Sequence, residues 1–221
     1  MRRLITTALM ASLATAPVFG ALSTREQRRI EEATTVLKEL HAAPDQDVPS
    51  DLWDKASCVI VIPGLKKAAF VFGGEYGKGL MSCRHDGGWS PPVFMSLGKG
   101  SWGLQIGAQS IDLVLLVMND KGVEKLLRNR VSLGAEASVA AGPVGRDARA
   151  ATDAQLQAEI LSYSRTQGVF AGINLSGGVL REDTDDTQDL YGQGISARSV
   201  LLEGRVQLPG IARPFVEALN R

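Results

Sequence analysis

The residues best suited by type and spacing to do chemistry lie in a glycine-rich stretch, FVFGGEYGKGL, at positions 70–80. Glycines next to a lysine are typical of phosphate-binding loops. Such a loop requires GxxxxGK followed directly by Ser or Thr, so that backbone amides, the lysine and a hydroxyl reach the phosphates and magnesium together. Here Gly79 follows Lys78, and in LGKGS at 97–101 a glycine separates the lysine from the serine. The spacing therefore argues against a nucleotide site and favours strands and turns.

No other set of side chains has the pattern of an enzyme active site or a metal centre. Cys83 and His85 alternate onto one face of an expected strand, but a histidine near a turn explains this equally well. The acids between 182 and 189 are of a type that calcium binds, yet Gln188 stands where the calcium loop needs glycine. Acids at a helix N-terminus also cap free amides. Two cysteines and two histidines are a poor supply for zinc. We therefore expect no catalysis, no metal and no cofactor.

Basic residues in the glycine-rich half of the chain form the third chemical pattern. If neighbouring strands bring them together, they form a basic rim on an apolar, glycine-lined surface. Such a rim suits an anionic lipid head group. The alternative is that these are scattered side chains facing solvent. The candidate lipid-binding residues are Lys66, Lys67, Lys78, Arg84 and Lys99.

Cys58 and Cys83 are the two cysteines of the chain, and both fall in expected strands. If those strands lie side by side, the pair can form one disulfide in an oxidising compartment. If they do not, the two residues are separate buried thiols. The sequence leaves both alternatives open.

The N-terminus has the pattern of a secretory signal peptide. Two arginines precede an apolar stretch from Leu4 to Ala16, and Gly20 provides a small residue at the expected cleavage site. The stretch is shorter than the segment of about 20 apolar residues that spans a bilayer. This pattern predicts an exported protein, located in a bacterial periplasm or envelope.

Hydrophobic periodicity predicts the elements that must position these residues. Positions 23–41 have the pattern of an amphipathic helix, with a capping box formed by Ser23 and Glu26. From Ser57 onward, short β-branched runs ended by glycine-containing turns predict about eight strands. No βαβ rhythm is visible, which argues against a parallel nucleotide-binding sheet. Short helices are expected at 50–56, 120–129, 183–192 and 214–220.

These patterns together predict an α+β fold. We expect a single domain with a strongly bent or barrel-like antiparallel β-sheet of about eight strands, an N-terminal helix and short flanking helices. The predicted division is a signal peptide at 1–20, a helical segment at 21–56 and a β-rich domain at 57–221. The 24 basic and 24 acidic side chains balance. This balance argues against a protein that coats nucleic acid.

Four ordered blocks of the sequence, spread over residues 40–192, resemble the SYLF domain family. They read CVIVIPGLKKAAFVFGGEYGKGLMSCR, GGWSPPVFMSLGKGSWGLQIGAQSIDLVLLVMN, LGAEASVAAGPVGR and YSRTQGVFAGINLSGGVL. The resemblance implies a lipid-binding module, because eukaryotic members bind phosphoinositide membranes and some bind or bundle actin. Bacterial members are commonly exported.

On these grounds we expect an exported, non-enzymatic module at the cell envelope whose partner is a membrane lipid. The alternative is a structural or protein-interaction module of the envelope that has no lipid ligand.

Overall fold

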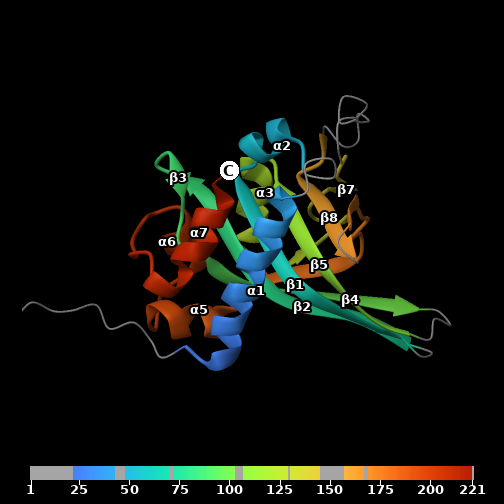
Figure 1. Ribbon diagram of the computed structural model, residues 1–221, viewed down its shortest axis with the longest axis horizontal. Coiled ribbons are helices and arrows are strands. Elements are labelled where there is room, and N and C mark those ends of the chain that lie inside the picture. The colour runs from blue at the N-terminus through green and yellow to red at the C-terminus, as the bar shows by residue number, and fades with distance from the viewer. Residues whose placement is uncertain are drawn as a thin grey trace, which may run out of the picture.

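A long, curled β-sheet, crossed on one face by the N-terminal helix, dominates the protein (Figure 1). The predicted α+β single domain is confirmed. The expected signal peptide at 1–20 and the turn expected at 167–168 lie outside the described residues. The computed structural model describes residues 22–42, 48–69, 72–102, 107–128, 130–144, 157–166 and 169–220.

Within the described ranges the sheet has ten strands, eight of them in the order β6-β10-β4-β2-β1-β5-β8-β7. Strand β3 pairs with β2, and β9 pairs with β8. The bounds are β1 Cys58–Ala69, β2 Phe72–His85, β3 Gly88–Trp89, β4 Val93–Trp102, β5 Gly107–Val117, β6 Val131–Ser132, β7 Val139–Ala141, β8 Ile160–Thr166, β9 Val169–Gly172 and β10 Gly178–Glu182. The named strands pair antiparallel except for β7 with β8, which are parallel. The sheet is therefore mixed rather than purely antiparallel.

The bend of the central strands comes from a bulge in β1. The register with β2 shifts between Val61 and Lys66, around Pro63 and Gly64. Gly64 has a φ of +58°, a left-handed conformation that glycine adopts without steric cost. Opposite the bulge, a Cβ at Gly79 would lie 1.9 Å from the carbonyl oxygen of Val61. Glycine at this position therefore lets β2 approach the bulged strand.

One face of the sheet is covered by α1 (Thr24–His41) and α7 (Arg213–Leu219), which lie side by side (Figure 1). The predicted capping box is present, because the Ser23 amide donates to Glu26 Oε2 at 2.7 Å and the Ser23 hydroxyl accepts from the Glu26 amide. Ile30, Leu37 and Leu40 of α1 are fully buried against the sheet. They occur at helical spacing, so the apolar stripe in the sequence is the face that packs.

The same face is completed by α2 (Ser50–Lys55). Its Trp53 is buried, and the indole Nε1 donates to the carbonyl oxygen of Leu219 at 3.2 Å. Since Leu219 ends α7, this bond ties the start of the domain to its C-terminal helix. In the described ranges no helix combines the length and the hydropathy that crossing a membrane demands.

The opposite face carries a second hydrophobic core beneath α3 (Asp120–Leu126), α6 (Ala197–Leu201) and the adjoining loops. A buried carboxylate, that of Glu159, links α3 to the residue that precedes β7. Lys125 Nζ lies 2.7 Å from each Glu159 oxygen, and the Ser138 amide donates to Oε2 at 2.9 Å. Burial alone would raise the pKa of Glu159, but these hydrogen bonds outweigh it and hold the pKa below its ordinary value.

The disulfide that the sequence left open is present. Cys58 and Cys83 stand directly opposite each other in the register of β1 and β2 and are bonded to each other. The predicted helices are confirmed with small changes in their ends. The helix expected at 120–129 ends at Leu126, and α5 spans Thr184–Tyr191.

Candidate functional site

The structure places the five predicted basic residues in three different parts of the sheet. Three of them lie toward one end, where β1, β2, β4 and β5 extend beyond the helices (Figure 1). In the register, Lys67 is opposite Glu75, which in turn is opposite Lys99. Lys66 lies opposite Tyr76. We call Lys66, Lys67 and Lys99 the lysine end of the sheet.

The two faces at the lysine end differ because neighbouring side chains in a strand alternate. Lys67, Glu75 and Lys99 form a cross-strand row on one face, and Lys67 Nζ lies 3.2 Å from a Glu75 oxygen. Lys66 and Tyr76 are on the other face, and Tyr76 is 51% exposed. Among the residues that the structure describes, Lys66 and Lys99 have no ion pair. Two cations at this end are therefore available to a ligand.

A groove of about 890 Å³ runs between the first turns of α1 and strands β1 and β2. Lys66 and Lys78 line it from the sheet, and Arg25 and Arg28 line it from the helix. Arg25, Arg28 and Lys66 are exposed, and none has an ion pair within the described ranges. Glu32, also exposed, lines the same groove, so its exposed charged lining carries three cations and one carboxylate, a net positive charge.

At the floor of the groove, by contrast, carboxylates neutralise the positive charges. Arg29 Nη1 lies 2.5 Å from Asp186 Oδ2, and Lys78 Nζ lies 3.1 Å from the same oxygen. Lys78 is also paired with Asp183. Burial alone would lower the pKa of Lys78, but its bonds to Asp183 and Asp186 outweigh this and raise it. Any anion that reaches Lys78 must compete with these carboxylates, and its role as a lipid contact stays a prediction.

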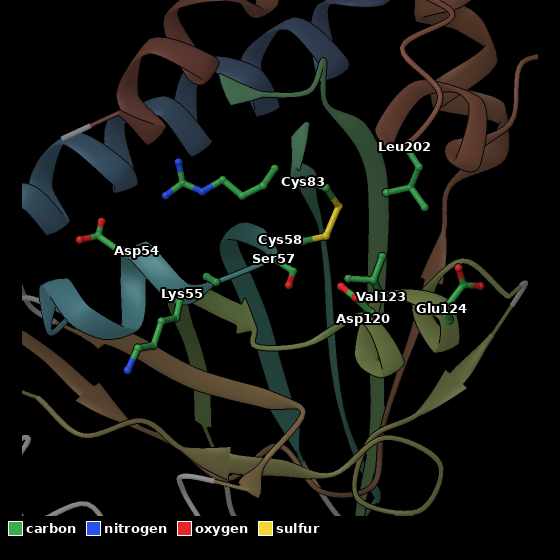
Figure 2. Close-up of a pocket in the computed structure, with 11 residues that line it drawn as sticks. Asp54, Lys55, Ser57, Cys58, Cys83, Asp120, Val123, Glu124 and Leu202 are labelled. Atoms are coloured by element: carbon green, nitrogen blue, oxygen red, sulfur yellow. A yellow bond between two sulfur atoms is a disulfide. The ribbon is translucent and has the colours of Figure 1, made fainter. Parts of the chain in front are cut away.

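Arg84 lies at the other end of β2, on the order of 25 Å from Tyr76 at the ordinary rise of a strand. Its guanidinium carbon lies 3.9 Å from the centroid of the Trp89 ring. Desolvation lowers the pKa of Arg84, and the nearby Asp54 partly opposes this shift. Arg84 lines a separate pocket of about 430 Å³ that also contains the disulfide (Figure 2). The structure thus does not bring Arg84 together with the lysine end.

Sequence reasoning missed Arg25 and Arg28 as groove residues. The sequence does contain one indication of their arrangement: a spacing of three positions puts both arginines on the same side of a helix. Nothing local shows that this side faces Lys66, which is far away in the sequence. The assignment required the packing of α1 across the sheet.

The sequence predicts that the acids of α5 cap the N-terminus of that helix, but the side chain of the N-cap residue Asp183 makes no capping hydrogen bond and pairs with Lys78 instead. In the described part of the chain, Glu26, Asp186 and Asp189 bring carboxylate oxygens within 4.8 Å of one another. Glu26 already accepts a hydrogen bond from the Ser23 amide, and Asp186 is paired with Arg29 and Lys78. Glu26 and Asp186 are thus used within the protein, and Asp186 links α5 to α1 and β2.

Comparison with known proteins identifies the class to which this curled α+β domain belongs. The chain is a member of the Ysc84 family, whose model is described as "Las17-binding protein actin regulator" and matches residues 98–221. The resemblance to SYLF domains is therefore confirmed.

Three relatives show the extent of the similarity. The chain is 39% identical over 165 residues to "SH3 domain-containing protein PJ696.02" of Schizosaccharomyces pombe, covering 73% of this chain and 38% of the relative. It is 31% identical over 180 residues to "Protein YSC84" of Saccharomyces cerevisiae, covering 80% and 38%. It is 30% identical over 197 residues to "SH3 domain-containing YSC84-like protein 1" of Mus musculus, covering 86% and 57%. The chain thus spans between 38% and 57% of the length of these relatives.

These relatives correct the predicted location. They come from yeasts and a mammal, which points away from a bacterial periplasm or envelope. The prediction of a bacterial periplasmic or envelope location is therefore wrong. It rested on the composition of the first twenty residues alone, and a short basic and apolar pattern is weak evidence for location.

Proposed function

We propose that this domain is a non-enzymatic module that binds membranes containing anionic lipid. The observation that carries the proposal is the convergence of unpaired cations from distant parts of the sequence. Arg25 and Arg28 on α1 line the same groove as Lys66 on β1, and Lys99 lies at the same end of the sheet but on its opposite face. Cations without internal partners are available to the phosphates of lipid head groups.

The expected strength of this attraction follows from the number of charges. Each Lys or Arg near an anionic membrane surface contributes about 1 kcal/mol, so the three cations that share the groove contribute about 3 kcal/mol. That corresponds to weak, salt-sensitive binding, and stable attachment needs a second, apolar contribution.

One aromatic side chain supplies apolar character at the same end of the sheet. Tyr76 is half exposed next to Lys66. An exposed aromatic side chain next to a lysine is a combination that peripheral membrane proteins use.

A second candidate function is that of a protein-interaction module. It is favoured by the family description, which names Las17 binding and actin regulation. The unpaired cations of the groove would suit an acidic protein as well as a lipid. The chain spans less than two thirds of the length of these relatives. For this chain, binding of the partner named in the family description is therefore a proposal.

Vesicle co-sedimentation of the full chain tests the leading proposal. We expect binding to phosphatidylcholine vesicles that contain phosphatidylserine, little binding to pure phosphatidylcholine, and weakening as salt is added. Arg28→Glu combined with Lys66→Glu should abolish most of the binding, since both residues line the groove. The matched control is Lys55→Glu with Lys121→Glu, since both residues are exposed and lie on α2 and α3.

Two results would reject membrane binding at this site. One is the absence of sedimentation with any vesicle, and the other is an equal loss in the test and control variants. If the protein does not sediment with vesicles but forms a stable, lipid-free protein complex in native mass spectrometry, the result would support a protein-interaction module.

A further inference from the structure

Two grooves of opposite charge lie along one flank of α1. Figure 1 shows α7 beside the other flank, so that this one faces the end of the sheet where β1, β2, β4 and β5 extend. The groove described above, here called the basic groove, lies beside the first turns of the helix. A second groove of about 500 Å³ lies farther along the helix and shares Glu32, Pro63 and Gly64 with the first.

The second groove, here called the acidic groove, is lined by four carboxylates and one guanidinium. The guanidinium, that of Arg165, is paired with Glu39 and Asp112. The other two carboxylates, those of Glu31 and Glu32, are exposed and have no ion pair among the residues that the structure describes. The acidic groove therefore keeps free carboxylates, whereas the basic groove keeps a net positive charge.

Both grooves lie on the face of the sheet that α1 covers. Asp112 lies opposite Arg165 in the register of β5 and β8. Ser110, two positions before Asp112 in β5, lies opposite Lys66 in β1. Side chains two positions apart in a strand point to the same face, so the carboxylate of the acidic groove and the lysine of the basic groove share that face. A single partner surface can therefore contact both grooves at once.

The exposed charges of α1 follow the same division. Arg25 and Arg28 line the basic groove in the first half of the helix, and Glu39 lines the acidic groove in the second half. Glu32, between them, lines both grooves, and Lys38 lines neither. A helix whose N-terminal half is basic and whose C-terminal half is acidic along one flank is complementary to a second copy of itself in the antiparallel direction.

A two-fold axis makes this complementarity exact in sequence. If the axis passes between Arg28 and Glu32, Arg28 of each copy lies next to Glu32 of the other, and the contact forms twice. Arg25 and Lys66 of one copy then approach the acidic groove of the other. Any other partner would have to present the same order of charges at the same spacing, which α1 already has.

We infer that the partner of the two grooves is a second copy of this chain. The two α1 helices cross antiparallel, and the basic groove of each copy faces the acidic groove of the other. Tyr76, 51% exposed in the basic groove, adds an aromatic contact beside the charge pairs. The dimer is weak and sensitive to salt, because exposed ion pairs are individually weak and are screened. The inference does not rest on membrane binding, with which the dimer competes for the basic groove.

Sedimentation equilibrium of the full chain, without lipid, tests the inference. We expect a reversible monomer–dimer equilibrium whose dissociation constant rises as salt is added. Arg28→Glu should raise the dissociation constant at least about tenfold, because it places like charges together at both symmetry-related contacts. Glu32→Arg should have the same effect for the same reason.

A mixture of the two variants gives the sharper measurement. In a heterodimer of Arg28→Glu with Glu32→Arg, both contacts at the axis again join opposite charges. We therefore expect the mixture to dimerise more tightly than either variant alone. Circular dichroism shows whether each variant is folded. The matched controls are Arg213→Glu and Glu217→Arg, since these residues are exposed, four positions apart on α7 and outside both grooves.

The inference is overturned if the wild type remains monomeric at millimolar concentration. It is also overturned if folded Arg28→Glu dimerises as tightly as the wild type does, or if the controls weaken the dimer equally. A mixture of the two variants that dimerises no better than each alone would refute the antiparallel arrangement of α1. Since no lipid is present, none of these outcomes depends on whether the domain binds membranes.

Discussion

Removal of the Cys58–Cys83 disulfide is the perturbation whose cost can be worked out most directly from the structure. The bond joins residues with a sequence separation of 25. In the chain-entropy relation, closing a loop of this length lowers the entropy of the unfolded state by an amount worth about 3.5 kcal/mol at room temperature. Reduction of the wild-type protein should therefore lower its free energy of unfolding by about 3.5 kcal/mol.

The double variant Cys58→Ala with Cys83→Ala separates this entropic cost from packing. Both side chains are buried, with 0% and 1% exposed, so alanine adds no buried polar group while it removes two sulfur atoms from the core. We expect the free energy of unfolding of the variant to fall by about 3.5 kcal/mol from the lost cross-link and by a further amount from lost packing. The difference between the variant and the reduced wild type measures the packing cost alone.

Urea denaturation of the oxidised wild type, the reduced wild type and the double variant is the assay. The denaturant slope should rise on reduction, because the unfolded chain exposes more surface without the cross-link. The variant, which has no thiol, should not respond to a phosphine reductant. A change of less than about 1 kcal/mol on full reduction of the wild type would refute the loop-entropy reasoning.

Three further predictions concern single positions. Gly79→Ala should destabilise the domain by about 3 kcal/mol or more in urea denaturation, since its Cβ would lie 1.9 Å from a backbone oxygen. Gly98→Ala, whose Cβ would have nothing within 4 Å, should cost far less, and an equal cost would contradict the clash. Ser23→Ala should cost about 1 kcal/mol through loss of the capping box, and an unchanged stability would show that α1 does not need it. Glu159 has a folded-state pKa held below the unfolded value of about 4.3, so its stabilisation is complete above that pH and is lost as the pH falls through the folded pKa. Glu159→Gln should accordingly flatten the loss of stability in this acid range, and an unchanged pH profile would exclude the role assigned to Glu159.

Local patterns predicted the elements of this fold well. The helix at 24–41 follows from an apolar stripe at helical spacing and from a capping box whose two residues are three positions apart. The strands follow from β-branched runs between glycines. These features depend on interactions within a few residues, and so the sequence shows them directly. The parallel pairing of β7 with β8 depends on which distant strands meet, and no local pattern signalled it.

The candidate site was only partly predictable for the same reason. Lys66, Lys67 and Lys99 were identified from their type and neighbourhood, and they do share one end of the sheet. The partners of Lys78 come from α5 and its N-cap residue, more than a hundred positions later in the chain, so the sequence did not show that the charge of Lys78 is neutralised.

The sequence by itself therefore determined the class of fold, the family, the main helices and strands, and the absence of known nucleotide-binding motifs. The tertiary structure alone decided that Cys58 faces Cys83, that Arg25 and Arg28 line the same groove as Lys66, and that Arg84 belongs to a separate pocket. The physical reason is that strand register and the position of α1 are set by the burial of two hydrophobic cores, one on each face of the sheet. That burial is a property of the whole chain, and it determines which charges remain unpaired.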